Sequence, residues 1–363
     1  MKKIGIVTFH TALNYGAVMQ TYALQNFLHD LGYDVEVIDY KCPFIEKCYN
    51  PFFVSDKKYL NAIIRGIVFG GTISKKRKKF EAFVRDNIQL SKAYYDSNEL
   101  KKDRNNYSFF ISGSDQVWSP ISAGFDIFYF LPFAENSQKL SYAASIGSAK
   151  LDNITRTELY RRLEGFSMLS VREESAKQLL SEANKERKIE VHPDPTLLLG
   201  RNKWLEIAEL PHVEYKYVLL FNVEKPINDI EFAKKIASDR KLKLVYINDR
   251  TIKKDSEIIY IEAPSPTEFI GLFANAEVVV TNSFHGSVFS VIFHKEFYVE
   301  LENKKQRNIR VEGLLSQLNI PSRDIENGKI NSEIDWIDIE NILYEKRSIV
   351  KKYITDCIDS NLE

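Results

Sequence analysis

The chain has 363 residues, and its 50 lysines and arginines balance 50 aspartates and glutamates, so its formal net charge is zero. This balance argues against a protein that coats nucleic acid by neutralising phosphates, and we expect no nucleic-acid partner. The length favours two domains, and an apolar fraction of 44% is enough to build their cores. Three cysteines, none in a C-x-x-C pair, argue against a disulfide framework and a cysteine-built metal site. We therefore expect a reducing compartment and no metal.

The beginning of the chain does not have the pattern of a signal peptide. Its apolar run, residues 4–9, is short and is followed by the polar residues His10 and Asn14. No window approaches the ~20 apolar residues that a bilayer-spanning helix needs. These patterns predict a soluble, cytoplasmic protein.

The first forty residues predict one βαβ unit. Residues 4–9 form a strand-like apolar run, residues 17–31 carry the apolar stripe of an amphipathic helix, and residues 35–40 form a second strand. Two parallel strands joined by a helix indicate an α/β sheet that is buried on both faces. Residues 41–105 interrupt this pattern, and we interpret them as a helical insertion.

This insertion is strongly basic. Residues 57–104 hold 13 basic and 5 acidic residues, a net of +8, and include the run at 75–79. The segment is either a solvated helix face, which is the usual role of such runs, or a surface that lies on an anionic membrane beside a lipid-linked substrate.

Strands and helices then alternate to the end of the chain. Strands are predicted at 107–112, 139–146, 168–171, 189–192, 217–223, 242–248, 257–261, 277–281 and 296–301. Helices are predicted at 154–166, 173–180, 227–240, 266–275, 284–293, 307–318 and 338–359. The helix at 266–275 has Ser265 as a candidate N-cap, Pro266 at its first position and Glu268 in its first turn.

We therefore predict two α/β domains, at 1–200 and 201–337, followed by a C-terminal helix at 338–363. We expect the domains to face each other across a cleft. Open α/β sheets bind ligands outside the carboxyl ends of their strands, so the junctions between strands and helices are the candidate sites.

Three such junctions lie in the first domain before residue 150. Asn14 and Gly16 stand at a helix start, where free amides favour an anion, although an ordinary loop with a capping Asn has the same pattern. Asp115 follows small residues at a strand end and is a candidate general base, and Trp118 is a candidate platform for a sugar face. A turn with an Asp cap and a core Trp explains the same residues. Ser145 lies in a third, small-residue strand end, which tight packing explains better.

Two further junctions carry a cation or an imidazole. Arg172 directly follows a strand and could bind a carboxylate or phosphate through two nitrogens, but a surface ion pair with Glu173 or Glu174 explains it more simply. His285 lies in the first turn of a helix, where it could bind an anion and move protons near neutral pH, or could be a structural histidine. The recurrence of anion-binding groups at strand ends indicates an enzyme that acts on a phosphorylated small molecule.

Six motifs, in this order, resemble the bacterial polysaccharide pyruvyl transferase family over residues 4 to 301. They are Asn14-Tyr15-Gly16-Ala17 with Gln20 and Tyr22-Ala23-Leu24-Gln25; Gly113-Ser114-Asp115-Gln116-Val117-Trp118; Tyr142-Ala143-Ala144-Ser145-Ile146-Gly147; Ser170-Val171-Arg172-Glu173; Asp194-Pro195-Thr196-Leu197-Leu198; and Thr281-Asn282-Ser283-Phe284-His285-Gly286.

The resemblance implies a GT-B-like fold of two Rossmann-like domains facing a cleft. It also implies transfer of the pyruvyl group of phosphoenolpyruvate onto a sugar of a surface polysaccharide precursor, such as a capsule or exopolysaccharide, with release of phosphate. The product is a cyclic ketal. Phosphoenolpyruvate is then the donor substrate, the acceptor is a glycan or lipid-linked oligosaccharide, and no cofactor is expected.

By resemblance, Arg172 holds the donor anion, His285 binds its phosphate and acts as the acid, and Asp115 is the candidate base. Some relatives carry an arginine two positions before the histidine; Ser283 stands there in this chain, which makes Arg307 and Arg310 candidates for the missing contact. The remaining expected substrate-binding residues are Asn14, Gly16, Gly113, Ser114, Gln116, Trp118, Ser145, Thr281, Ser283 and Gly286. Asp194 is interpreted as a turn residue.

Two other functions stay open at this point. One is a GT-B glycosyltransferase that uses a nucleotide sugar, and the other is a non-catalytic member of the fold that binds a phosphorylated metabolite. The donor separates the glycosyltransferase from a pyruvyl transferase, because the former releases a nucleoside diphosphate and the latter releases phosphate. Ligand binding without turnover would favour the non-catalytic member.

Overall fold

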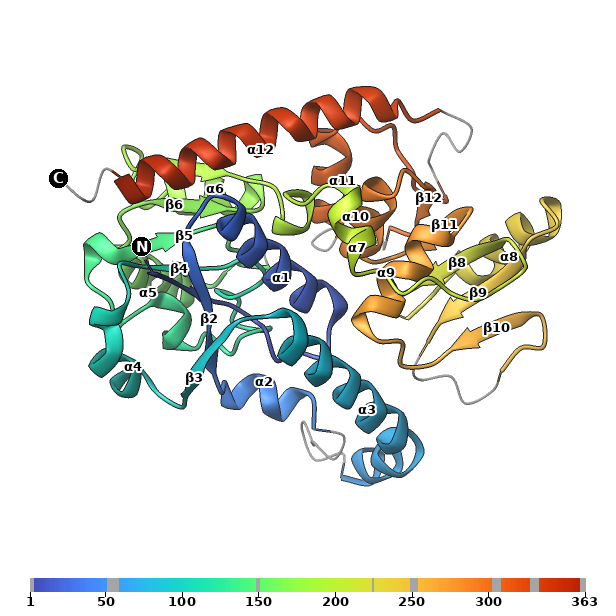
Figure 1. Cartoon of the computed structure of the whole chain (residues 1–363), viewed down its shortest axis with the longest axis horizontal. Coiled ribbons are helices and arrows are strands. Elements are labelled where there is room, and N and C mark those ends of the chain that lie inside the picture. The colour runs from blue at the N-terminus through green and yellow to red at the C-terminus, as the bar shows by residue number, and fades with distance from the viewer. Residues whose placement is uncertain are drawn as a thin grey trace. The chain divides into compact units, whose positions relative to one another are not determined.

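The computed structural model describes residues 3–50, 59–147, 151–223, 225–248, 254–301, 308–326 and 333–359, with side chains described from residue 68 onward in the helix that begins at Tyr59. The chain divides into two compact units. The first comprises Met1–Tyr49, Val84–Leu198 and Asn341–Glu363, and the second comprises Asn50–Phe83 and Leu199–Glu340. Each unit is built on a five-stranded parallel sheet (Figure 1).

The sheet of the first unit has the order β3-β2-β1-β4-β5. Its strands are β1 (Lys3–Val7), β2 (Asp34–Tyr40), β3 (Leu90–Tyr94), β4 (Phe109–Ser112) and β5 (Lys139–Ser141). Helix α1 (Tyr15–Asp30) connects β1 to its parallel neighbour β2, which confirms the predicted βαβ unit.

The first unit continues beyond β5 with a small parallel sheet. This sheet pairs β6 (Leu169–Val171) with β7 (Ile189–Val191), and helices α5 (Asn153–Leu163) and α6 (Glu174–Ser181) accompany it. Single bridges from Asp115 to Ala144 and from Ala144 to Val171 align the segments that follow β4 and β5 with the end of β6. The junctions at 115, 144 and 172 are therefore neighbours in space.

The segment at 41–105 is only partly helical. It contains α2 (Pro43–Cys48), α3 (Tyr59–Asn87) and α4 (Ser97–Asp103), as expected, but Leu90–Tyr94 forms the edge strand β3. The prediction missed β3 because an edge strand buries little of its surface and needs few apolar residues. The predicted strand at 139–146 is also too long, since pairing with β4 ends at Ser141.

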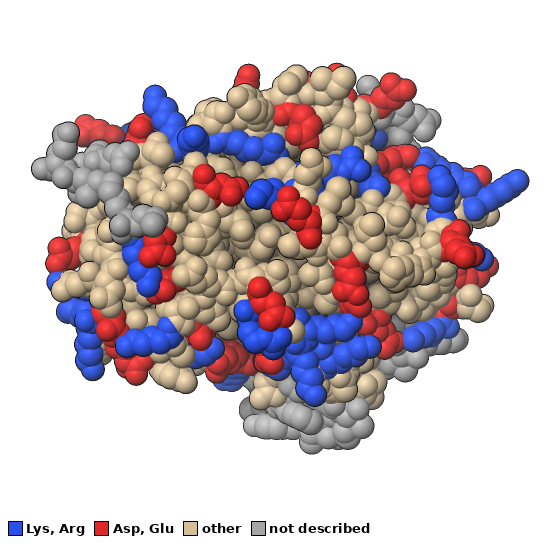
Figure 2. All heavy atoms as spheres, viewed as in Figure 1, with Lys and Arg blue, Asp and Glu red and all other residues tan. Residues whose placement is uncertain are grey.

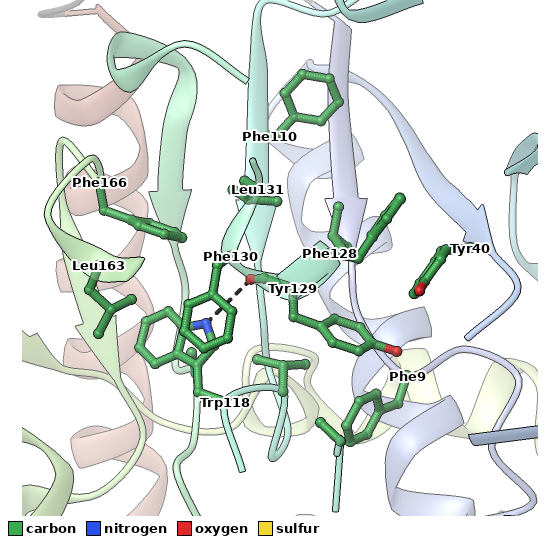
Figure 3. Packing of buried hydrophobic residues seen from close by; sticks show 14 of the residues in the cluster. Phe9, Tyr40, Phe110, Trp118, Phe128, Tyr129, Phe130, Leu131, Leu163 and Phe166 are labelled. Atoms are coloured by element: carbon green, nitrogen blue, oxygen red, sulfur yellow. Dashed lines mark hydrogen bonds between the residues drawn. The ribbon is translucent and has the colours of Figure 1, made fainter. Parts of the chain in front are cut away.

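Many aromatic residues pack together in the core of the first unit (Figure 3). Trp118 is fully buried, stacks on Phe130 with ring centroids 6.1 Å apart, and meets Phe166 edge-on. Its indole nitrogen donates to the Tyr129 carbonyl at 3.3 Å, so the one polar group of the ring is satisfied inside the core.

The sheet of the second unit has the order β10-β9-β8-β11-β12, again all parallel. Its strands are β8 (Tyr217–Phe221), β9 (Lys243–Ile247), β10 (Ile258–Ile261), β11 (Val278–Thr281) and β12 (Glu296–Val299). Its helices are α7 (Arg201–Glu206), α8 (Asp229–Asp239), α9 (Pro266–Asn275), α10 (Phe284–Ile292) and α11 (Asn308–Gln317). The two α/β units confirm the predicted fold class.

Local capping fixes the start of α9. The Ser265 hydroxyl accepts from the Glu268 amide at 3.0 Å, and the Glu268 carboxylate accepts from the Ser265 amide, which together form a capping box. Lys79 of α3 also lies 2.5 Å from the Glu268 carboxylate. The predicted bounds of this helix are confirmed.

The last helix, α12 (Trp336–Asp359), runs through the predicted C-terminal helix. In the first unit, its Arg347 donates to the Leu197 carbonyl at 2.9 Å and its Tyr353 hydroxyl donates to the Ser141 carbonyl at 3.1 Å.

In the part of the chain that the structure describes, no helix combines the length and the apolar character needed to cross a membrane. Lysines and arginines are interspersed with acidic side chains over the face shown in Figure 2.

Candidate active site

Each of the two sheets has a topological switch point, where the strand order changes direction. In the first sheet it lies between β1 and β4, and in the second it lies between β8 and β11. Ligands of open parallel sheets bind outside the carboxyl ends of the strands at such points. The residues that follow these four strands are therefore the candidate site residues of each unit.

A polar network joins the two strand ends at the first switch point. The Gln20 amide nitrogen donates to the Thr8 hydroxyl at 2.8 Å, and the Gln20 amide oxygen accepts from the Ser114 amide at 3.2 Å. The Thr8 hydroxyl in turn donates to the Ser114 carbonyl at 2.9 Å. Gln20, which was not among the predicted site residues, thus ties α1 to the carboxyl ends of both strands.

Asn14 caps the helix that begins at this switch point. Its side-chain oxygen accepts from the Ala17 amide at 3.3 Å, and Asn14 itself is exposed whereas Gly16 is buried. The capping interpretation of Asn14 is therefore correct. The amino-terminal end of α1 also carries the partial positive charge that favours an anion, so binding remains a prediction for this position.

A second loop of the site follows β4. Gly113 has a φ of +115°, and a Cβ there would lie 2.4 Å from the Tyr142 carbonyl oxygen, so the position accepts only glycine. Asp115 has a φ of +73° and its carboxylate accepts from the Gln116 amide at 2.9 Å. The Gln116 side chain accepts from the Ser122 hydroxyl at 2.6 Å.

Two predicted substrate contacts in this unit are core residues instead. Trp118 has no exposed ring face, so the structure corrects the prediction that it stacks on a sugar and supports the core interpretation. Ser145 is also fully buried, and its hydroxyl donates to the Glu173 carboxylate at 2.7 Å. Ser145 therefore fixes a neighbouring acid rather than presenting its hydroxyl to a ligand.

Arg172 lies buried among three carboxylates. Its Nη1 is 2.7 Å from Asp194, its Nε is 3.3 Å from Glu173, and its Nη2 is 3.8 Å from Asp115. Burial alone would lower the pKa of this guanidinium, but the three carboxylates raise it above its ordinary value. The expected ion pair of Arg172 is therefore real, but it is buried rather than on the surface.

Asp194 has a larger role than a turn residue. Its carboxylate does cap the 3-10 helix Pro195–Leu197, accepting from the Thr196 amide at 3.1 Å and the Thr196 hydroxyl at 2.7 Å. The other oxygen of the same carboxylate holds Arg172. Sequence reasoning missed this contact because Asp-Pro-Thr explains the turn without it, and the two partners are 22 residues apart.

At the second switch point, two asparagines link the segments that follow β8 and β11. The Asn222 side chain accepts from the Asn282 amide at 3.2 Å, and the Asn282 side chain accepts from the Val223 amide at 3.0 Å. The Thr281 hydroxyl donates to the Phe221 carbonyl and accepts from the Ser283 amide at 3.0 Å. Thr281, a predicted substrate contact, is fully buried and holds the ends of β8 and β11 together.

His285 lies in the first turn of α10, as predicted, directly after this junction. Ser283 caps the helix by accepting from the Gly286 amide at 3.3 Å. A Cβ on Gly286 would lie 2.3 Å from the Thr281 hydroxyl oxygen, so this turn packs tightly against the strand end. The His285 ring meets the Phe284 ring edge-on at 5.1 Å, and the residue is 9% exposed, so the imidazole is largely buried.

One of the two candidate arginines can be placed. The Arg310 guanidinium lies over the Phe284 ring, 5.9 Å from its centroid, and Phe284 directly precedes His285. Arg310 is therefore close in space to the histidine turn. Arg307 lies outside the described residues.

Two acids of the second unit were not predicted. Glu300, which follows β12, accepts from the Ile227 amide at 2.9 Å and the Asp229 amide at 3.2 Å at the start of α8. Asp229 is fully buried; burial, and then the charge of Glu300, raise its pKa to about 7. The pairing links residues 71 positions apart, and neither residue stands in a recognisable motif.

A buried histidine–aspartate pair also supports the first unit. His10 Nε2 lies 2.9 Å from Asp39, which also pairs with Lys41 at 2.7 Å. Burial favours the neutral acid, but His10 and Lys41 together lower the pKa of Asp39. The pair anchors the loop between β1 and α1.

Across the described residues, no group of three or more His, Cys, Asp or Glu side chains could hold a metal ion.

Nearly the whole chain resembles solved structures described as UDP-GlcNAc 2-epimerases. It matches a putative UDP-N-acetylglucosamine 2-epimerase from Listeria monocytogenes with a TM-score of 0.56 and 12% identity, covering 100% of this chain and 97% of that one. The UDP-GlcNAc 2-epimerase of Methanocaldococcus jannaschii, solved with UDP-GlcNAc and UDP, matches with a TM-score of 0.50 and 16% identity, over 95% and 99% of the two chains. The fold is therefore that of the GT-B class.

The sequence identifies the family within that fold. Residues 14–299 match the model of the family described as polysaccharide pyruvyl transferase, so this chain belongs to the polysaccharide pyruvyl transferase family. No protein among those with curated descriptions matches it significantly.

Proposed function

We propose that this protein is a ketal pyruvyl transferase that moves the pyruvyl group of phosphoenolpyruvate onto a sugar of a surface polysaccharide precursor. Membership of the family supports the transferase activity and a polysaccharide acceptor. The donor and the acceptor sugar are our proposal.

The reaction needs one acid and one base. The acid protonates the methylene carbon of phosphoenolpyruvate, and a sugar hydroxyl adds to C2 as it loses its proton to the base. The C2–O bond to phosphate then breaks, and phosphate leaves with the bonding electrons. A second hydroxyl adds to C2 and releases its proton, which closes the ketal. Stabilising the charge that develops at C2 and on the leaving phosphate is the main task of the protein.

We assign three residues to these tasks. His285 binds the phosphate and supplies the proton, because an imidazole can do both near neutral pH. Arg172 binds the anionic donor, and Asp115 accepts the proton of the first hydroxyl. The observation that carries the proposal is the position of His285: it lies in the first turn of α10, at the switch point of its sheet, where backbone amides favour an anion.

The test measures phosphate release from phosphoenolpyruvate in the presence of lipid-linked glycans. The wild-type protein should release phosphate only when a suitable glycan is present. His285→Ala should lower kcat by about 10²–10⁴, the usual loss for a proton donor. The matched control is His294→Asn, a change at the histidine that follows α10 and pairs with Glu340, which should leave kcat unchanged.

The other donor class is tested in the same reaction. The epimerase from Methanocaldococcus jannaschii was solved with UDP-GlcNAc and UDP, so a nucleotide sugar is the natural comparison donor. Release of UDP from UDP-GlcNAc, with no phosphate from phosphoenolpyruvate, would establish a glycosyltransferase and refute the proposal.

We further propose that the enzyme works in the cytoplasm, at the inner face of the membrane, and touches that surface through the basic part of α3. Lys75 and Lys78 are exposed there, whereas Lys79 is half-buried and paired with Glu268. Changing Lys75 and Lys78 to Glu should reduce sedimentation with anionic liposomes if the helix lies on lipid. Unchanged sedimentation would mean that this is a solvated helix face.

A further inference from the structure

The three carboxylates around Arg172 differ in their distance from the guanidinium and in their burial. Asp194 approaches Nη1 to 2.7 Å, and its side chain is fully buried. Glu173 approaches Nε to 3.3 Å and is almost as buried. Asp115 stands 3.8 Å from Nη2, beyond hydrogen-bond distance, and its side chain is 14% exposed.

Asp194 and Glu173 are fixed by other partners. Asp194 also accepts two hydrogen bonds from Thr196, and Glu173 also accepts one from the Ser145 hydroxyl. Moving either acid would leave buried polar groups without partners, which is costly. These two acids are therefore positioning residues that fix the plane of the guanidinium.

Asp115 is the carboxylate that can leave. Apart from Arg172, its side chain accepts from the amide of its own neighbour, Gln116, at 2.9 Å. Its backbone carbonyl accepts from the Ser145 amide at 2.9 Å, so the loop stays in place while the side chain turns. The Nη2 edge of Arg172 is thus the edge at which one carboxylate can exchange for another.

We propose that Asp115 and the carboxylate of the donor compete for this edge of Arg172, so that donor binding releases Asp115 to act as the base. This inference rests on the proposed function. The guanidinium binds the donor carboxylate through charge-assisted hydrogen bonds, which are stronger than its 3.8 Å contact with Asp115. Asp115 then accepts the proton of the acceptor hydroxyl while the oxygen of that hydroxyl bonds to C2.

The exchange couples donor binding to activation of the acceptor. Without the donor, Asp115 is held by Arg172 and does not face a hydroxyl. With the donor bound, the carboxylate is free beside the carbon that the hydroxyl attacks. The consequence is an ordered reaction in which the donor binds first.

The experiment is calorimetric titration of the full-length protein with phosphoenolpyruvate, without acceptor. Asp115→Asn removes the competing charge, and asparagine tolerates the φ of +73° at this position. Asp115→Gly removes the whole side chain and suits that backbone equally well, which covers failure of the first variant to fold. Both should bind the donor at least about tenfold more tightly than wild type, which corresponds to about 1.4 kcal/mol.

Two further variants test whether tighter donor binding comes from lost competition at Arg172 or from a general change in charge. Glu174→Gln removes an exposed charge two residues from Arg172, and it should leave the dissociation constant within about twofold if general electrostatics is a small effect at the surface. Arg172→Gln should abolish measurable binding, because it removes the group for which the two carboxylates compete.

The outcomes distinguish the inference from the function on which it rests. If wild type binds the donor and Arg172→Gln does not, but both Asp115 variants bind like wild type, the competition is refuted and the proposed function stands. If Glu174→Gln tightens binding as much as Asp115→Asn does, the effect is general charge and the competition is again refuted. If neither wild type nor any variant binds phosphoenolpyruvate, the proposed function is refuted, and the competition that depends on it is refuted as well.

Discussion

The buried carboxyl group of Asp229 predicts how the stability of the protein depends on pH. It is fully buried at the start of α8, beside Glu300, and its pKa is raised to about 7 from an ordinary value of 3.8. Burial is the larger cause and the charge of Glu300 is the second. The helix start favours a negative charge there, but this effect is smaller than the other two.

The sign and size of the effect follow from proton linkage. Between pH 3.8 and about 7, the folded protein holds a proton on Asp229 that the unfolded chain has already lost. The stability contributed by the protonated form is therefore complete below pH 3.8, and it is lost as the pH rises to about 7. The difference between the ordinary pKa and the raised pKa of Asp229 corresponds to about 4 kcal/mol in the free energy of unfolding, at about 1.4 kcal/mol for each pKa unit.

Asp229→Asn should remove this loss, because the amide is neutral at every pH and has the shape of the protonated acid. The variant should match wild type near pH 4 and be about 4 kcal/mol more stable near pH 8, a rise of about 10 °C in the melting temperature. Scanning calorimetry of both proteins across that pH range measures the difference directly.

The matched control is Glu231→Gln in the same first turn of α8, where the carboxylate is exposed. It should show no pH-dependent gain in stability. A raised pKa of Asp229 is ruled out as the cause if Asp229→Asn is less stable than wild type near pH 8, or if its gain in stability is the same at both ends of the pH range.

Three further substitutions test the packing around the sites by their effect on the free energy of unfolding. Trp118→Ala should cost about 3–5 kcal/mol, as for other large buried aromatics, and a loss near zero in urea unfolding would place the ring outside the core. Ser265→Ala should cost about 1 kcal/mol by removing the capping box of α9, and an unchanged calorimetric transition would contradict that contribution. Gly286→Ala should destabilise by about 1–3 kcal/mol because its Cβ would meet the Thr281 hydroxyl at 2.3 Å; a stability equal to wild type would show that the turn can relax.

Local patterns were sufficient to predict most elements of this fold. Helix α9 was predicted residue for residue because its cap, its proline and its first-turn acid all lie within four positions. Strand β3 was missed because Leu90–Tyr94 is an edge strand with a half-polar sequence, and its strand character comes from pairing with β2. The apolar pattern could not show that pairing.

The site was harder to predict, because its contacts join residues far apart in the chain. The positions of Arg172 and His285 at strand-to-helix junctions followed from the sequence. The sequence did not show that Asp194 holds Arg172 from 22 residues away, or that Glu300 faces Asp229 from 71 residues away. Trp118 had two possible roles because its sequence neighbours do not reveal whether the ring is covered, and burial decides between them.

The most direct test of the proposed activity follows the carbon of the donor. The purified protein is incubated with isotopically labelled phosphoenolpyruvate and lipid-linked glycans, and the glycans are analysed by mass spectrometry while phosphate is measured in the same samples. We expect the glycan to gain one labelled pyruvate with loss of one water, in equal amount to the phosphate released. His285→Ala should form about 10²–10⁴-fold less product per unit time. A glycan that gains a sugar from UDP-GlcNAc, and no label from phosphoenolpyruvate, would contradict the proposed pyruvyl transferase activity.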